Sequence, residues 1–185
     1  MRTFSPAHIA LNWKTYPLFL CFFLLSLLYE LIVSLRLFLY EKGIFRGYRS
    51  NVPVISIGNL SSGGSGKTPM TDFLATQLTE HQITFAILSR GYKRESQSTV
   101  SRYCALEDPF RTSQQIGDEP YLLAHKHPNV PVYVGRQRSQ SARLCELWES
   151  VQMLLLDDAY QHLAIHRDLN LLLIDAATDL DQFQL

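Results

Sequence analysis

The chain has 185 residues, which is enough for one domain with a hydrophobic core. Its 17 basic residues equal its 17 acidic residues, and this zero formal net charge argues against a nucleic-acid-binding surface. The three cysteines, Cys21, Cys104 and Cys145, are far apart and match no metal-binding spacing, so they indicate a reducing compartment rather than a disulfide framework.

A strongly apolar segment at residues 16–40 is the first predicted element, and we expect it to be helical. Residues 17–29 carry no charge, and Glu30 and Arg36 then interrupt the apolar run. A membrane span needs about 20 apolar residues, a length that this segment reaches only if Glu30 is accepted. A spanning helix, a helix lying in the membrane interface, a signal peptide and a buried soluble helix are the alternatives.

The flanks of this segment favour a membrane anchor. No small-residue cleavage site follows it, which disfavours a signal peptide. Apolar residues on all sides and aromatic residues at both ends favour a membrane over a soluble core. Lys42, Arg46 and Arg49 follow, which favours a cytoplasmic C-terminal side. We therefore expect an anchor helix and a basic linker at 1–50, and a core domain at 51–185.

A phosphate-binding loop is predicted at the start of the core domain. β-branched residues at 52–57 predict a short buried strand, and helix formers at 70–80 predict a helix. Between them lies a run rich in glycine and serine that ends in Gly66-Lys67-Thr68. Strand, glycine-rich loop, Gly-Lys-Thr and helix is the order of a P-loop, whose backbone N–H groups surround a phosphate.

The expected nucleotide-binding residues are Ser61, Ser62, Gly63, Gly64, Ser65, Gly66, Lys67 and Thr68. Lys67 can reach the β- and γ-phosphates of ATP, and the Thr68 hydroxyl can bind Mg²⁺. The usual pattern has glycine where Ser61 stands, so a serine- and glycine-rich surface loop is the alternative interpretation. The strand before the loop and the helix after it favour the P-loop.

Further strands and helices alternate along the rest of the chain. Apolar runs predict strands at 84–89, 130–134, 153–157 and 170–175, and helices are expected at 121–127 and 137–150. Residues 93–108 are polar and predict a loop with a short hairpin. This alternation predicts an α/β, P-loop NTPase-like parallel sheet with helices on both faces, and such sheets bind ligands at the carboxyl ends of their strands.

Two acidic pairs are candidates for the chemistry. Asp157 and Asp158 follow an apolar strand, the position at which P-loop proteins place a Walker B acid that holds Mg²⁺. Asp175 ends another strand, where we favour a turn or capping role. Asp118 and Glu119 precede the helix at 121–127, and Asp118 is either the helix N-cap or the base for an attacking hydroxyl.

Basic side chains are the remaining candidates. Arg90 follows a predicted strand and is a candidate for binding a substrate phosphate. His162 and His166 have a zinc-like spacing but no third ligand, so we do not expect a zinc site. Arg167 and Asp168 partly match the catalytic loop of protein kinases, but Leu173 stands where that loop needs asparagine. We therefore expect these two residues to form a turn before the last strand.

These motifs together resemble the tetraacyldisaccharide 4'-kinases of lipid A synthesis, in order and approximate spacing across residues 52–175. The family's P-loop also lacks the first glycine, as at Ser61, and its N-terminal membrane anchor matches the apolar segment. The matching residues are Gly58-Asn59-Leu60, Gly63 to Pro69, Ser89-Arg90-Gly91-Tyr92, Gly117-Asp118-Glu119-Pro120, Asp157 to His162, and Arg167-Asp168.

The resemblance implies transfer of the γ-phosphoryl group of ATP to the 4'-hydroxyl of a tetraacyl glucosamine disaccharide 1-phosphate. It implies ATP and Mg²⁺ as cofactors, a lipid A disaccharide precursor and the membrane as partners, no nucleic acid, and the cytoplasmic face of the bacterial inner membrane as location. The implied catalytic residues are Asp118, the base, with Lys67 and Asp158. Thr68, Asp157 and Glu119 are the expected metal ligands, and Arg90 and His162 the expected substrate contacts.

This chain departs from the family at two points. Ala159 and Tyr160 stand where the family usually has Gly and Phe or Leu, so the local turn is expected to differ, because alanine lacks the freedom of glycine at positive φ. The family's second α/β lobe, which contributes a histidine that partners the base, is not in this sequence, and we expect a truncated chain.

Two other functions are alternatives to a lipid kinase. One is a P-loop ATPase of the partitioning or metal-carrier type, although Ser62 stands where the loop of that type has its second lysine. A nucleotide-binding fragment without catalysis is the other.

Overall fold

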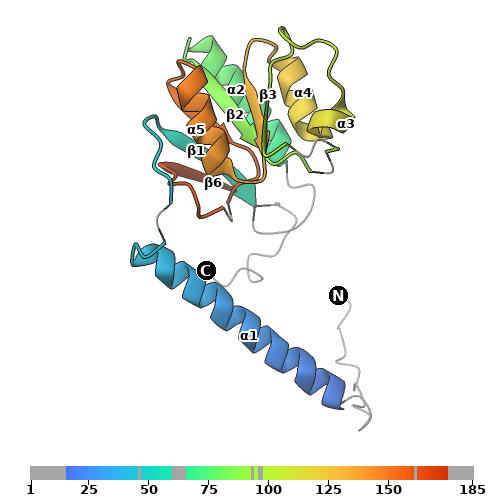
Figure 1. Cartoon of the computed structure of the whole chain (residues 1–185), viewed down its shortest axis with the longest axis vertical. Helices are drawn as coiled ribbons and strands as arrows, with labels where there is room; N and C mark the ends of the chain where they lie inside the picture. The colour runs from blue at the N-terminus through green and yellow to red at the C-terminus, as the bar shows by residue number, and fades with distance from the viewer. Residues whose placement is uncertain are drawn as a thin grey trace, which may run out of the picture. The chain divides into compact units, whose positions relative to one another are not determined.

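The computed structural model describes residues 16–45, 47–59, 66–92, 94–95, 98–160 and 162–174, in two units that divide between Arg46 and Gly47 (Figure 1). In the first unit, α1 runs from Tyr16 to Glu41. Its stretch Phe19–Tyr40 is long and apolar enough to cross a membrane, and the side chains at 19–38 are exposed. The helix predicted at 16–40 is therefore confirmed.

The second unit is built on a six-stranded sheet with the order β3-β4-β2-β5-β1-β6 (Figure 1). All neighbouring strands are parallel except β3 and β4, which are antiparallel. The strands are β1 (Val54–Asn59), β2 (Phe85–Ser89), β3 (Val100–Tyr103), β4 (Val132–Gly135), β5 (Met153–Leu156) and β6 (Leu169–Leu173). The helices are α2 (Lys67–Glu80), α3 (Ser113–Ile116), α4 (Asp118–Lys126) and α5 (Arg138–Trp148).

Helices cover both faces of this sheet, as predicted. Successive strand side chains point to opposite faces, so Phe85 and Ile87 of β2 join the core under α2, α3 and α4. Ala86 and Leu88 of the same strand join a second core under α5. Both faces of a central strand are therefore buried, which is why β2 is apolar from Phe85 to Leu88.

The structure corrects several expectations about local elements. No hairpin forms in the described part of 93–108, because β3 pairs with the distant strand β4 instead. The N-cap of α4 is Gly117, and Asp118 is already the first helical residue. Positive φ occurs at Asp158 and not at Ala159, so alanine is tolerated there without backbone strain. Asp175 lies outside the described residues.

Candidate active site

The candidate site residues gather at the carboxyl edge of the parallel strands. β5 lies between β1 and β2, with Ser56 of β1 and Leu88 of β2 both opposite Leu156. The segments that follow these three strands therefore leave the sheet at the same edge. Lys67, Arg90 and Asp157 are on those segments, so the topology brings together residues that are far apart in sequence.

Lys67 is the first residue of α2, and its side chain contacts residues at the ends of two strands. Gly66 before it has φ 78°, a left-handed conformation that glycine adopts without strain. The Lys67 Nζ donates to Asn59 Oδ1 at the end of β1 (3.0 Å) and lies 3.7 Å from Asp158 Oδ1 after β5. The Lys67 side chain is 16% exposed, whereas that of Asp158 is 52% exposed. The predicted pair of Lys67 and Asp158 is thus brought together.

Asp157 is a buried carboxylate at the end of β5, only 1% exposed. Its Oδ1 lies 3.0 Å from the Thr71 hydroxyl of α2, whereas no hydrogen-bond partner of its buried Oδ2 is found in the described part of the chain. Burial raises the pKa of Asp157 to about 6, and the negative charges of Glu119 and Asp158 add to this effect. A positive ligand beside Oδ2 would therefore be strongly favoured.

Arg138 is a buried guanidinium beneath this edge, 2% exposed, at the start of α5. It donates to the carbonyl oxygens of Gly135 (2.8 Å) and Asp157 (3.2 Å), and so ties the end of β4 to the end of β5. Burial lowers its pKa to about 10, and the positive charge of Arg90 acts in the same direction.

The loop after β2 packs against the start of α4. Gly91 has φ 66° and Gly117 has φ 99°, and a Cβ added to Gly117 would lie 3.1 Å from the Gly91 Cα. Arg90 and Asp118 are the exposed neighbours of these two glycines. This close backbone approach places the loop that carries Arg90 against the start of the helix that carries Asp118.

The remaining predicted residues are placed less completely. Thr68 is half-buried in the first turn of α2. His162 is half-buried, and its backbone N–H donates to the Ala159 carbonyl oxygen (3.0 Å). Ser61, Ser62, Gly63, Gly64 and Ser65 lie outside the described residues. The described residues on either side of this loop are Asn59 and Gly66.

Three site residues were missed by the sequence analysis: Asn59, Thr71 and Arg138. Asn59 contacts Lys67, Thr71 contacts Asp157, and Arg138 contacts the Asp157 backbone. Thr71 is four residues after Lys67, one helical turn, and this spacing could have indicated that it faces the same edge. Arg138 gave no comparable signal, because a basic residue at the start of a helix is ordinarily solvent-exposed.

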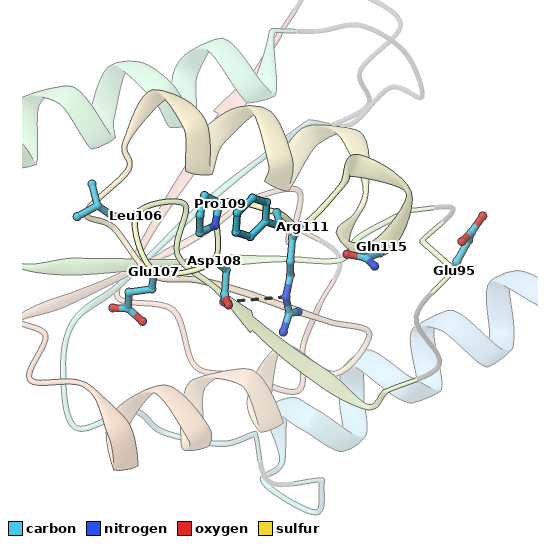
Figure 2. A pocket seen from close by; sticks show the side chains of 8 residues that line it. Glu95, Leu106, Glu107, Asp108, Pro109, Arg111 and Gln115 are labelled. Carbon is cyan, nitrogen blue, oxygen red and sulfur yellow. Dashed lines mark ion pairs between the residues drawn. The ribbon is translucent and has the colours of Figure 1, made fainter.

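A separate open pocket is lined by the segment that connects β3 to α4 and by Glu95, which precedes β3 (Figure 2). Its lining includes Leu106, Pro109 and Gln115, and a single ion pair joins Asp108 and Arg111 across 3.9 Å. None of the predicted site residues lines it. The acidic and basic groups at the strand ends therefore form a different site.

This chain is similar to a family of kinases along most of its length. The family model described as tetraacyldisaccharide-1-P 4'-kinase matches residues 18–185. A protein of Desulfatibacillum aliphaticivorans named tetraacyldisaccharide 4'-kinase is 44% identical over 153 residues, which cover 83% of this chain and 42% of the relative. A protein of the same name from Syntrophotalea carbinolica is 42% identical over 173 residues, which cover 91% of this chain and 48% of the relative.

A solved structure is also similar. It is described as "apo" form LpxK from Aquifex aeolicus in complex with ATP, and it matches with a TM-score of 0.71 and 41% sequence identity. The match covers 80% of this chain and 46% of that chain. The chain therefore spans about half the length of the curated relatives and of the structure that it matches.

Proposed function

Because this chain belongs to the tetraacyldisaccharide-1-P 4'-kinase family, we propose that residues 47–174 are the ATP-binding core of a kinase that phosphorylates a lipid A precursor. The reaction is transfer of the γ-phosphoryl group of ATP to the 4'-hydroxyl of a tetraacyldisaccharide 1-phosphate. The observation that carries this proposal is the meeting of Lys67, at the start of α2, with Asp158, at the end of β5. The described half of the family length supplies the nucleotide side of the reaction.

Lys67 is the proposed contact to the β- and γ-phosphates. Without nucleotide, its ammonium group lies against Asn59 and Asp158, and these two oxygens hold it at the carboxyl edge. Phosphate oxygens are stronger acceptors than a neutral amide, so ATP would take the Asn59 hydrogen bond without moving α2. The similar Aquifex aeolicus structure is a complex with ATP, which supports ATP as the nucleotide.

The residues at this edge fit a magnesium ion. The buried Oδ2 of Asp157, for which the described residues offer no partner, is a hard oxygen donor, and Thr68 offers a hydroxyl one helical position after Lys67. No three His, Cys, Asp or Glu side chains converge on one point within the described ranges, so phosphate oxygens and water would complete the coordination shell. When bound, Mg²⁺ supplies positive charge against the negative charge of the transferring phosphoryl group.

The acceptor would approach along the start of α4. Asp118 is exposed there and makes no capping hydrogen bond, so its carboxylate can accept the proton of the 4'-hydroxyl. Arg90, on the adjoining loop, is the proposed partner of an acceptor phosphate, and His162 is a second proposed substrate contact. Glu119 acts through its charge on Asp157 or as a further metal ligand.

The lipid acceptor also gives α1 a role. A tetraacyl lipid is held in a membrane, and α1 is long and apolar enough to cross one. The Arg36 guanidinium lies 5.9 Å from the centroid of the Tyr40 ring, and Lys42 Nζ lies 5.5 Å from that of Phe38, a combination of aromatic and basic groups typical of the membrane–water interface. We place the core at the cytoplasmic face of the inner membrane, where ATP is available.

The proposal is tested by following the γ-phosphate of labelled ATP, with and without tetraacyldisaccharide 1-phosphate, in a chain of full family length that contains these 185 residues. Label in the lipid at the 4'-position is the expected result. Acceptor-independent release of inorganic phosphate would instead support the partitioning-type ATPase. Binding of ATP with neither outcome would support a nucleotide-binding module without catalysis, and the kinase proposal would then fail.

A further inference from the structure

The turn after β5, residues 157–160, connects two different neighbours of that strand. The Asp157 N–H donates to the Leu88 carbonyl oxygen of β2 (3.0 Å), whereas the Ala159 N–H donates to the Ile57 carbonyl oxygen of β1 (3.2 Å). The chain therefore crosses from β2 to β1 at Asp158. To make this crossing, Asp158 adopts φ 50°, the left-handed region that residues with a Cβ seldom occupy.

Side-chain packing leaves little room around this turn. A Cβ on Gly58 would lie only 2.4 Å from the Cβ of Tyr160, so Tyr160 packs directly on the backbone at the end of β1. This packing limits where the turn can lie, but it does not determine the backbone conformation of Asp158. An unfavourable conformation persists only when surrounding contacts hold it.

Arg167 provides such a contact. Its guanidinium donates to the carbonyl oxygens of both Ala159 (3.3 Å) and Tyr160, the two residues that follow Asp158. No ion pair of Arg167 occurs within the described ranges, so these carbonyl groups are its observed partners. Both hydrogen bonds are donated by one nitrogen, Nη1, whose two N–H groups serve the two neighbouring carbonyl oxygens.

The backbone of Arg167 is in turn fixed by its neighbour. The Asp168 N–H donates to the Val54 carbonyl oxygen (2.9 Å), and Asp168 Oδ2 accepts from the Val54 N–H (2.8 Å). Asp168 is thus fixed at the first residue of β1, and the Arg167 side chain reaches from there to the turn that is bonded to Ile57. Asp168 and Arg167 together therefore connect the amino end of β1 to the active-site turn.

We propose that Arg167 is a positioning residue that holds Asp158 in its left-handed conformation and thereby keeps the Asp158 carboxylate beside Lys67. This inference rests on the proposed kinase function only where it concerns magnesium and ATP. The contact to the turn itself is independent of any ligand. Arg167 does not touch the reacting groups and acts through Asp158.

The first test examines the turn in the 185-residue chain without ligand. Hydrogen exchange is measured at the Ala159 amide, which is bonded to Ile57, and at the His162 amide, which is bonded to Ala159. The Leu154 amide, which is bonded to Pro53 at the other end of β5, is measured for comparison. In Arg167→Met, exchange at Ala159 and His162 should accelerate by roughly tenfold or more, while exchange at Leu154 stays within about twofold. Arg111→Met, a matched change at a partly exposed arginine in the β3–α3 segment, should alter none of the three.

The second test asks whether Arg167 acts through Asp158. ATP binding is titrated with Mg²⁺ in Arg167→Met, Asp158→Asn and the double variant. Each single change should raise the Mg²⁺ concentration needed for half-maximal ATP affinity by roughly tenfold, and the double variant should be no worse than Asp158→Asn alone. Arg167→Lys, which keeps a positive charge and N–H donors on a side chain that is one atom shorter, should lie between wild type and Arg167→Met.

Different results separate the possible failures. Equal acceleration of exchange at all three amides would show that Arg167 supports the whole fold and would overturn the proposal, as would additive effects in the double variant. If wild-type protein shows no Mg²⁺-dependent ATP binding, the proposed function fails, and the exchange pattern alone then decides whether Arg167 holds the turn. If Arg167→Met does not fold, the same measurements on Arg167→Lys decide the question.

Discussion

Asp157 illustrates how a site residue can destabilise the protein that contains it. Burial raises the pKa of its carboxyl group to about 6 from an ordinary value near 3.8. Between these two values the folded state binds more protons than the unfolded chain, so this group makes the fold less stable as pH rises through that window. Above pH ~6 the charged Asp157 lowers the free energy of unfolding by its full amount.

We therefore predict that Asp157→Asn stabilises the metal-free, nucleotide-free chain at pH ~7.5 by roughly 1–3 kcal/mol. Asparagine has nearly the same shape, so the contact to Thr71 can be kept while the buried charge is lost. Thermal unfolding as a function of pH measures this effect. The advantage of the variant should disappear below pH ~4, and an equal gain at both pH values would contradict the buried-charge explanation.

Asp118 allows the clearest separation of chemistry from stability. The structure gives it no side-chain capping bond, because Gly117 is the N-cap of α4. Asp118→Asn, in a chain of full family length, should lower kcat by roughly 10²-fold or more, since an amide cannot accept the proton, with little change in melting temperature. Glu80→Gln, an exposed change at the far end of α2, is the control. Near-normal kcat in Asp118→Asn would remove this residue from the mechanism.

Residue positions could be predicted from sequence where a motif ties chemistry to position, and not elsewhere. The order of strand, loop and helix places Lys67 and Asp158 at the carboxyl edge, where they lie 3.7 Å apart. Asn59 belongs to a motif that the sequence analysis quoted, but its contact with Lys67 was not predicted. Arg138 could not be found in this way, because its contact with Asp157 depends on how β4 and β5 are placed in the sheet.

At the scale of elements, the central parallel strands and their covering helices were predictable because their apolar runs are continuous. Boundaries differed by a few residues: α2 begins at Lys67 rather than at Met70, because the P-loop lysine itself starts the helix. β3 could not be predicted as a sheet strand. Its four residues, Val100–Tyr103, include the polar Ser101 and Arg102, and only pairing with β4 fixes their conformation.

The packing of the loop after β2 against β4 and the end of α3 is an element-scale feature that can be tested through Gly91. Its φ is 66°, and a Cβ there would lie 2.2 Å from Val134 Cγ1 and 2.9 Å from the Ile116 carbonyl oxygen. Gly91→Ala should therefore reduce the free energy of unfolding by about 3 kcal/mol, through backbone strain together with overpacking.

Gly66→Ala provides the matched control, because Gly66 also has positive φ (78°) but, among the described residues other than its chain neighbours, no atom lies within 4 Å of an added Cβ. This variant should lose only about 1 kcal/mol, the contribution of backbone strain. Urea unfolding of both variants measures the difference. Equal losses would show that the close approach of Gly91 to β4 contributes nothing to stability.

At the scale of the whole molecule, the division after Arg46 separates an apolar helix from the α/β core. Tyr48 belongs to the core, because its backbone N–H donates to the Ala164 carbonyl oxygen (2.9 Å) and its side chain donates to Glu146 (3.0 Å). A chain that starts at Gly47 keeps these contacts. Deletion of residues 1–46 should therefore move the protein from the membrane fraction to the soluble fraction with the core still folded.

Sedimentation of membranes, followed by circular dichroism of the supernatant, checks this prediction. If the shortened chain still sediments with membranes as strongly as the parent, the anchor lies elsewhere in the chain. If it aggregates without a cooperative unfolding transition, α1 is part of the core and the division after Arg46 is wrong.

The proposed nucleotide site depends most on Lys67, and the direct measurement is a calorimetric titration of the 185-residue chain with ATP and Mg²⁺. Lys67→Ala removes the ammonium group that lies 3.0 Å from Asn59 Oδ1, and it should weaken ATP binding by at least about tenfold, the scale of a charged hydrogen bond. Lys126→Ala, which removes a surface lysine paired with Asp72, should bind as wild type does. Equal ATP affinity in Lys67→Ala and wild type would contradict the assignment of this edge as the nucleotide site.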